Sequence, residues 1–183
     1  VRHHFVGYEL KRRDLLAPCL AALRRHHNRH VPIQHADGFA QQGQSVKPFF
    51  QIDNDEFDKV MTINARSIHQ STKAALPALV RAGGGKIVNI ASGTFYYGPP
   101  GLSHYTASKA AVIGLTRGHA RELGEKNIQI NAIAVGLTES SSIRDNKKWD
   151  RARAPTVDSR SIKREMVPED LLGTLIFLCT SDS

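Results

Sequence analysis

Two stretches of sequence decide the fold: Gly85-Lys-Ile-Val-Asn-Ile-Ala-Ser92 and Ile128-Gln-Ile-Asn-Ala-Ile-Ala-Val135. Both contain short apolar runs of the length of a buried strand, so we expect strands over residues 86–91 and 128–135. Between them, residues 103–125 have helical periodicity. The expected apolar side of this helix consists of Ala107, Ala110, Ala111, Leu115 and Leu123. A strand, a helix and a strand of these lengths predict a βαβ crossover, with parallel strands and a right-handed connection.

A second helix is expected before this unit. The run from Asp53 to Asp58 offers a candidate N-cap and acidic side chains, which complement the exposed N–H groups at a helix start. Apolar residues then recur at helical spacing up to Gly83-Gly84-Gly85, namely Phe57, Val60, Met61, Ile68, Ala75 and Leu79. Pro77 is expected to kink this helix near its end.

A last helix is expected to begin at Pro168-Glu169-Asp170 and to continue through Leu178, since proline and acidic residues favour the first turn. Residues 137–167, which precede it, are polar, charged and without a periodic pattern. The sequence therefore predicts an α/β fold with two evident strands, which is an incomplete sheet.

The composition fits one soluble domain: the chain has 183 residues, of which 40% are hydrophobic. No apolar run approaches the roughly 18 to 20 residues of a membrane-spanning helix, so we expect no membrane association. The chain begins with Val1 and not with Met, and we expect an upstream piece. Cys19 and Cys179 have no metal-ligand spacing and, as isolated thiols, indicate the cytoplasm.

The N-terminal residues 1–44 form a basic leader, and residues 45–183 form the periodic remainder. Residues 1–30 hold seven Lys or Arg side chains and two acidic ones, so this short stretch supplies much of the chain's net charge of +8. A solvated or foreign leader is the favoured interpretation, and a nucleic-acid-binding arm is the alternative. The histidines at positions 26, 27 and 30 lack a Cys or carboxylate to complete a ligand set, so we predict no metal site.

Several polar residues follow the predicted strands, where ligands bind in open parallel sheets. Tyr105 and Lys109 are four residues apart, so they share one face near the start of a helix. A nearby ammonium favours the phenolate form, which makes this pair a candidate acid/base device. Ser92 directly follows a strand, and its hydroxyl is suited to hold a substrate oxygen. Asn64 interrupts an apolar stripe, so it is either a structural tie or part of a proton relay.

These residues occur in motifs that resemble the short-chain dehydrogenase/reductase family. The motifs are Phe57-Asp-Lys-Val-Met-Thr-Ile-Asn64, Gly85 to Ser92, Tyr105-Thr-Ala-Ser-Lys109-Ala-Ala, Asn131-Ala-Ile-Ala-Val-Gly136 and Val167-Pro-Glu-Asp170. The likeness covers residues 47–183. It implies the C-terminal part of a Rossmann-like, doubly wound parallel sheet with three α/β/α layers.

The resemblance also implies the role of each site residue. Tyr105 would be the acid/base, Lys109 would bind the nicotinamide ribose and lower the pKa of Tyr105, and Ser92 would polarise the substrate oxygen. Asn64 would anchor a water that links Lys109 to solvent, which favours the relay over the tie. The cofactor would be NAD or NADP, contacted in addition by Val135, Gly136, Thr138 and Ser140.

The sequence departs from the family pattern at several places. Val135-Gly136 stands where the family usually has Pro-Gly, and Ser140 stands where it usually has Thr. The glycines of Gly38-Phe-Ala-Gln-Gln-Gly43 have the wrong spacing for a dinucleotide turn, with no strand expected before them and no helix after them. His35-Ala-Asp-Gly38 only partly matches the family's Asn-Asn-Ala-Gly segment. We therefore expect a chain without the adenosine-binding half and the final strand.

The substrate side of the site is less well specified. Phe95, Tyr97 and Trp149 either line an apolar substrate pocket or are loop aromatics that pack against the body of the protein. Residues 138–166 resemble the family's mobile substrate lid. Arg151 and Arg153 in this segment either meet an anionic substrate or belong to a solvated lid, and the solvated lid is favoured.

Three hypotheses about function follow. The leading one is an NAD- or NADP-dependent oxidoreductase that interconverts a secondary alcohol and a ketone and resembles 3-oxoacyl reductases or secondary-alcohol dehydrogenases. Its partners would be a small-molecule substrate and, at full length, further copies in a homodimer or homotetramer, with no nucleic acid. The second is a truncated, catalytically impaired remnant that acts at most as an assembly partner through residues 55–80 and 103–124. The third is a nucleic-acid binder that uses residues 1–30.

Overall fold

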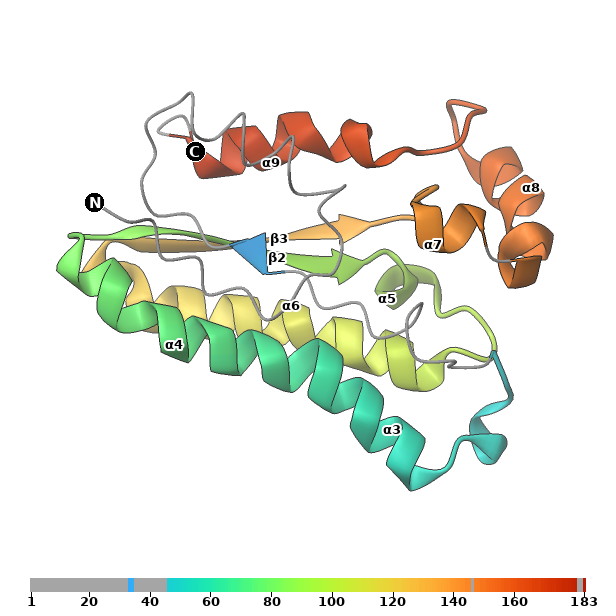
Figure 1. Ribbon diagram of the computed structural model, residues 1–183, viewed down its shortest axis with the longest axis horizontal. Helices are drawn as coiled ribbons and strands as arrows, with labels where there is room; N and C mark the ends of the chain where they lie inside the picture. Colours follow the sequence, from blue (N-terminus) through green and yellow to red (C-terminus); the bar gives the residue numbers. More distant parts are fainter. Residues whose placement is uncertain (1–32, 35–45, 146, 181–182) are drawn as a thin grey trace.

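The computed structural model describes residues 33–34, 46–145, 147–180 and 183, so most of the basic leader, with both of its glycine motifs and its histidines, lies outside the described residues. The centre is a parallel three-stranded sheet in the order β1 (Ile33–Gln34), β2 (Gly85–Ser92) and β3 (Ile128–Val135) (Figure 1). Both predicted strands are thereby confirmed. The expectation of two strands, with none before Gly38, was wrong, because β1 pairs with β2. Two residues are too short for a periodic signal.

Helices cover both faces of the sheet (Figure 1). One face carries α3 (Asn54–Met61), the π-helical turn η2 (Thr62–Arg66), α4 (Ser67–Arg81) and α6 (Ser103–Leu123). The other face carries α9 (Leu172–Cys179), which follows the 3₁₀ turn η5 (Pro168–Leu171). Smaller elements are the 3₁₀ turns η1 (Phe49–Gln51) and η3 (Gly124–Lys126). The fold is therefore the expected partial Rossmann-like α/β/α arrangement.

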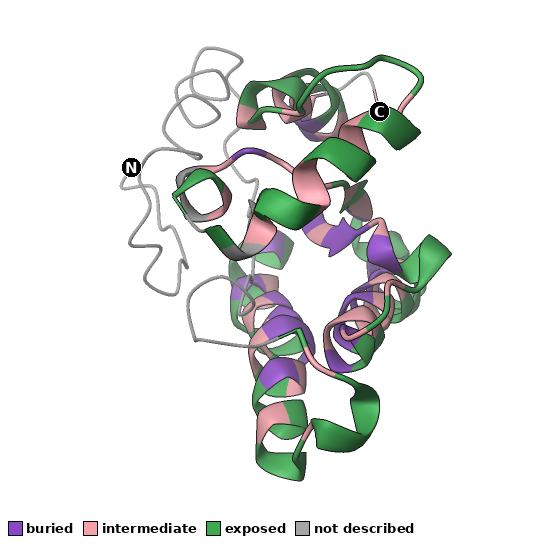
Figure 2. Ribbon diagram, turned by 90° about the vertical axis from the view of Figure 1, so that its right-hand side faces the viewer, coloured by how far each residue is buried: buried purple, intermediate pink, exposed green. Residues whose placement is uncertain are grey.

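The two faces of β2 contribute to different parts of the core. Ile87 packs with Leu79 of α4 and Leu123 of α6, whereas Val88 packs with Leu175 and Cys179 of α9. This division follows from the alternation of side chains along a strand. Figure 2 shows that buried positions gather on the helix sides turned towards the sheet.

The start of α3 forms as the sequence predicts. The side chain of Asp53 accepts a hydrogen bond from the Glu56 backbone N–H at 2.8 Å, which satisfies one of the donors at the helix start. The helix passes into the five-residue turn η2 and continues as α4, which contains Pro77 and extends to Arg81. Phe57 fits the helical spacing of the apolar residues, but it is 40% exposed.

The expected apolar side of α6 was correct at Leu123 and at Leu115, which packs against the core residues Ile68, Ala91 and Val112, and was wrong for the alanines. Ala107 is exposed, and Ala110, Ala111 and Leu115 are only partly buried. The buried residues of the helix are His104, Ser108, Lys109, Val112, Thr116 and Leu123. A mostly polar row faces the core because its members find partners there: Thr116 Oγ1 accepts from Asn89 Nδ2 at 2.9 Å and donates to the Val112 carbonyl at 2.7 Å.

A close backbone contact connects the amino ends of β2 and β3. Gly83, Gly84 and Asn127 all have positive φ, and the Gly85 N–H donates to the Asn127 carbonyl at 3.0 Å. A Cβ on Gly84 would collide with that carbonyl oxygen and would lie 2.7 Å from Asn127 Nδ2. Glycine is therefore required at position 84 by both conformation and space.

No helix in the described part of the chain is long and apolar enough to cross a membrane.

Candidate active site

The carboxyl ends of β2 and β3 meet at one edge of the sheet. Ser92 is in register with Val135, and the Gly93 N–H donates to the Val135 carbonyl at 2.8 Å. The short helix α5 (Thr94–Tyr97) and the start of α6 lie at the same edge (Figure 1). The three segments predicted to carry the site therefore lie at the edge where parallel sheets bind ligands.

Ser92 is held in place by Thr94. Its side chain is nearly buried, and its Oγ accepts hydrogen bonds from the Thr94 N–H at 3.3 Å and from Thr94 Oγ1 at 3.1 Å. Because both bonds use the oxygen as acceptor, the Ser92 hydroxyl keeps its own proton for donation. A substrate oxygen beside it would receive that hydrogen bond.

Tyr105 and Lys109 occupy the first two turns of α6. Lys109 is 2% exposed, and its Nζ donates to the Ile90 carbonyl of β2 at 3.1 Å. The same Nζ lies 5.8 Å from the centre of the Tyr105 ring, within the range of a cation–π contact. The predicted pairing on one helix face is confirmed. The effect of this amine on the protonation of Tyr105 stays a prediction.

Asn64 is completely buried in the turn η2 and reaches across to α6. Its Nδ2 donates to Ser108 Oγ at 2.9 Å, and Ser108 Oγ donates to the Tyr105 carbonyl at 2.7 Å. Of the two alternatives for Asn64, the structural role is observed, because its side chain is hydrogen-bonded to α6. A role of Asn64 in a proton relay stays a prediction. Sequence reasoning missed Ser108, whose only signal is its position between Tyr105 and Lys109.

The segment after β3 is folded on itself by short contacts. Thr138 Oγ1 donates to the Gly136 carbonyl at 3.1 Å, and the Ser140 N–H donates to the Thr138 carbonyl at 2.7 Å. Thr138 also pairs with Met166 in an isolated parallel bridge. These contacts place Gly136, Thr138 and Ser140 next to the carboxyl edge, where a cofactor role for them stays a prediction.

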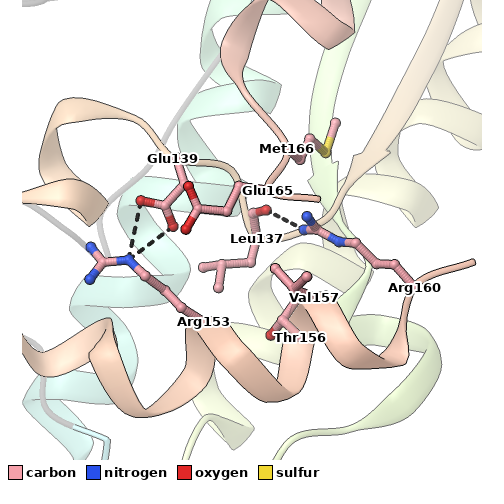
Figure 3. A pocket seen from close by; sticks show the side chains of 8 residues that line it. All are labelled: Leu137, Glu139, Arg153, Thr156, Val157, Arg160, Glu165 and Met166. Atoms are coloured by element: carbon pink, nitrogen blue, oxygen red, sulfur yellow. Dashed lines mark hydrogen bonds and ion pairs between the residues drawn. The ribbon is translucent and has the colours of Figure 1, made fainter. Parts of the chain in front are cut away.

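Residues 138–166 are more ordered than their sequence indicates. They contain the helix α7 (Ser141–Arg144), the 3₁₀ turn η4 (Lys147–Trp149) and the helix α8 (Asp150–Ser159). A shallow surface depression, without an enclosed cavity, lies between α8 and the adjacent chain (Figure 3). Its lining residues are Leu137, Glu139, Arg153, Thr156, Val157, Arg160, Glu165 and Met166.

The two arginines of this depression support the segment itself. Arg153 Nε donates to both carboxylate oxygens of Glu139 at 3.1 and 3.2 Å (Figure 3). Its guanidinium also contacts Asp150 and the Ile143 carbonyl. Arg160 donates to the Leu137 carbonyl at 2.6 Å. The reading of Arg153 as a contact for an anionic substrate was therefore wrong, since its donors already hold chain segments together. Arg151 is exposed, as expected of a solvated lid.

The aromatic residues proposed for the substrate side lie close to the surface. Phe95 and Tyr97 of α5 are 45% and 67% exposed, and Trp149 is partly buried. Phe95 packs edge-on against Tyr96 with ring centres 5.1 Å apart. Tyr97 is thus not packed into the body of the protein, and a pocket role for the three residues stays a prediction.

A buried polar cluster lies beside Tyr105 and was not found from the sequence. The side chain of His104 is fully buried, and its Nε2 lies 3.4 Å from Glu56 Oε1. Glu56 also forms an ion pair with Lys47, which connects the chain before α3 to the start of α6. Burial lowers the pKa of His104 below its ordinary value of 6.5, Glu56 opposes this effect, and Lys47 adds to it.

We expect this cluster to make the stability of the protein dependent on pH. Because the pKa of His104 is lower in the folded state, the unfolded chain takes up the proton more readily, and stability is lost as the pH falls below about 6.5. The midpoint of urea unfolding should drop between roughly pH 7.5 and 5.5, and His104→Gln should reduce that drop. Gln70→Asn, at an exposed position of α4 without an ionisable group, is the control and should leave the drop unchanged. An identical pH dependence with and without His104 would contradict the assignment.

Comparison with known proteins gives consistent matches. A family model described as enoyl-(acyl carrier protein) reductase matches residues 4–183. Dehydrogenase/reductase SDR family member 4 from Bos taurus is 36% identical over 145 residues, which cover 76% of this chain and 51% of that protein. The 3-oxoacyl-[acyl-carrier-protein] reductase FabG from Thermotoga maritima is 33% identical over 129 residues, 70% of this chain and 52% of that protein. The chain spans about half the length of these curated relatives.

Solved structures match as well. A putative short-chain alcohol dehydrogenase from Sinorhizobium meliloti superposes with a TM-score of 0.73 at 27% identity, covering 92% of this chain and 66% of that one. A 3-oxoacyl-[acyl-carrier protein] reductase with bound NAD from Brucella melitensis gives a TM-score of 0.74, with 93% of this chain and 62% of that one covered. At 24% identity, the second match supports the fold alone.

Proposed function

Because the chain belongs to the short-chain dehydrogenase/reductase family, we propose that its protein is an NAD- or NADP-dependent oxidoreductase that interconverts a secondary alcohol and a ketone. The observation that carries this proposal is the buried Lys109 ammonium, 5.8 Å from the ring centre of Tyr105. Ser92, at the end of the neighbouring strand β2, supplies a hydroxyl donor at the same edge of the sheet. The combination of a tunable phenol, an ammonium and a hydroxyl is suited to moving a proton at a carbon–oxygen bond.

The residues at the carboxyl edge fit the nicotinamide half of the cofactor. An ammonium is a good donor to the hydroxyl oxygens of a ribose, and Lys109 Nζ, which is bound to the Ile90 carbonyl of β2, would be that donor. At Gly136 a Cβ would meet nothing nearer than the Met166 sulfur at 4.0 Å, so the backbone there is open to close approach. When bound, the nicotinamide accepts or supplies the hydride.

In alcohol oxidation, the Tyr105 phenolate accepts the proton of the substrate hydroxyl while the carbinol carbon loses its hydride. Ser92 donates a hydrogen bond to the substrate oxygen and fixes its position. In ketone reduction the steps reverse, and the Tyr105 hydroxyl donates its proton to the carbonyl oxygen as the carbon gains the hydride. Lys109 stabilises the phenolate in both directions through its positive charge. Asn64 supports the pair through Ser108, and the water-anchoring role implied by the family is part of this proposal.

The substrate would be a small alcohol or ketone that reaches the edge between α5 and the segment 138–166. Phe95, Tyr97 and Trp149 would offer apolar contacts to it. A 3-oxoacyl compound and a simple secondary alcohol are both compatible with these side chains. Ala107 of α6 is exposed and Ala110 and Ala111 are only partly buried, which supports contact with further copies of the chain in a dimer or tetramer.

The competing proposal is a remnant without catalysis, because the chain spans about half the length of its relatives. Titration of the 183-residue chain with NADH and NADPH, followed by nucleotide fluorescence, separates the two proposals. Saturable binding of either nucleotide, together with turnover on a panel of ketones, is expected for the oxidoreductase. The absence of both binding and turnover would favour the remnant.

A further inference from the structure

Two histidines on neighbouring helices face each other away from the candidate active site. His69 lies in the first turn of α4, and His119 lies in the second half of α6. His69 Nδ1 and His119 Nε2 are 3.4 Å apart, and the two ring centres are 5.5 Å apart. His119 follows Tyr105 by fourteen positions on one helix, which corresponds to roughly 21 Å along its axis. The pair is therefore separate from the proton-transfer residues.

The spacing of the two nitrogens fits a shared metal ion better than a direct hydrogen bond. Protein hydrogen bonds with an N–H donor have heavy-atom distances of about 2.7 to 3.2 Å, so the observed 3.4 Å is long. Two imidazole nitrogens bound to one tetrahedral ion at about 2.05 Å lie about 3.4 Å apart. An ion just outside the line between the rings would thus reach both nitrogens with little movement of the side chains.

The surroundings of the two rings also suit a bound cation. Glu122 lies one helical turn beyond His119 on the same side of α6, so its carboxylate would attract a positive ion held between the imidazoles.

We propose that His69 Nδ1 and His119 Nε2 form a binding site for a borderline divalent transition-metal ion such as Zn²⁺, Ni²⁺ or Cu²⁺. Within the described residues, no group of three or more His, Cys, Asp and Glu side chains could hold an ion, so water completes the coordination. His119 Nδ1 is buried and has no hydrogen-bond partner in the described part of the chain, so no outer group fixes the ring. Affinity is therefore moderate.

The test uses the whole chain with the histidines that precede His69 replaced, because these side chains would also bind ions. The background protein carries Asn at positions 3, 4, 26, 27, 30 and 35. Isothermal titration with Zn²⁺ should show one equivalent bound. His69→Asn and His119→Asn should each weaken binding by about tenfold or more, and the double variant should bind no more weakly than either, because a single imidazole cannot chelate. Mg²⁺ should not bind, since it requires oxygen ligands.

A second measurement tests the site without replacing His69 or His119. In the same background, Zn²⁺ should shift the ring ¹⁵N resonances of His69 and His119 and leave those of the buried His104 unchanged. Absence of Zn²⁺ binding in the background protein would overturn the proposal. So would unchanged affinity in both single variants, or ring shifts confined to other residues. Nicotinamide binding plays no part in either readout, so failure of the proposed enzymatic function would not affect this result.

Discussion

Replacement of Tyr105 by Phe should lower kcat by about 10²- to 10⁴-fold while the fold and the affinity for nicotinamide nucleotide are kept. The substitution removes only the phenolic oxygen, which is the atom proposed to exchange a proton with the substrate. The ring that lies near Lys109 Nζ remains, so the packing at the start of α6 is preserved. Steady-state kinetics with the preferred nucleotide, together with circular dichroism, measure both effects.

Tyr96→Phe is the matched control for this prediction. Tyr96 is also a tyrosine near the carboxyl edge of the sheet, but it is 73% exposed and belongs to α5. Its variant should keep nearly all activity. If Tyr105→Phe retained activity comparable to this control, Tyr105 would not be the proton-transfer residue.

Replacement of Lys109 by Met should remove activity without a matching loss of stability. We expect kcat to fall by about 10²-fold or more, because the charge that favours the Tyr105 phenolate is lost. The unbranched Met side chain fills most of the same space, and the cost of burying an ammonium disappears. The free energy of unfolding should therefore not fall by the roughly 2 to 5 kcal/mol typical of a truncated core side chain.

Urea unfolding and steady-state kinetics, measured on the same samples, separate the two effects. Lys126→Met is the control, since Lys126 lies exposed in the turn η3 and should change neither quantity. If the free energy of unfolding of Lys109→Met fell by several kcal/mol together with its activity, Lys109 would instead support the structure through its bond to the Ile90 carbonyl.

The strands, the helices and the central pair of the site could be predicted because each depends on local pattern. The runs that became β2 and β3 are apolar and of strand length, and the four-residue spacing of Tyr105 and Lys109 fixes their shared face. Asp53 likewise caps α3 through a side chain three residues from its donor. In these cases the sequence neighbours themselves determine the structure.

The features that could not be predicted depend on contacts between distant segments. The core side of α6 is polar because Asn64 and Asn89, from other elements, supply its hydrogen bonds. The short strand β1 forms only through pairing with β2. The contact of Arg153 with the carboxylate of Glu139, fourteen residues away, likewise has no signal in the local sequence. Propensity and periodicity contain no information about such partners.

The contact between Gly84 and Asn127 has a practical consequence for protein engineering. It connects the amino ends of β2 and β3. Ser92 and Val135 lie at the carboxyl ends of these strands, about seven residues or roughly 23 Å away. Substitutions that alter reactivity and substitutions that endanger folding therefore fall at opposite ends of β2 and β3. A mutant library that varies α5 and the exposed positions of residues 138–166, and leaves Gly84, Asn127 and the contacts of Arg153 and Arg160 untouched, should therefore keep most variants foldable.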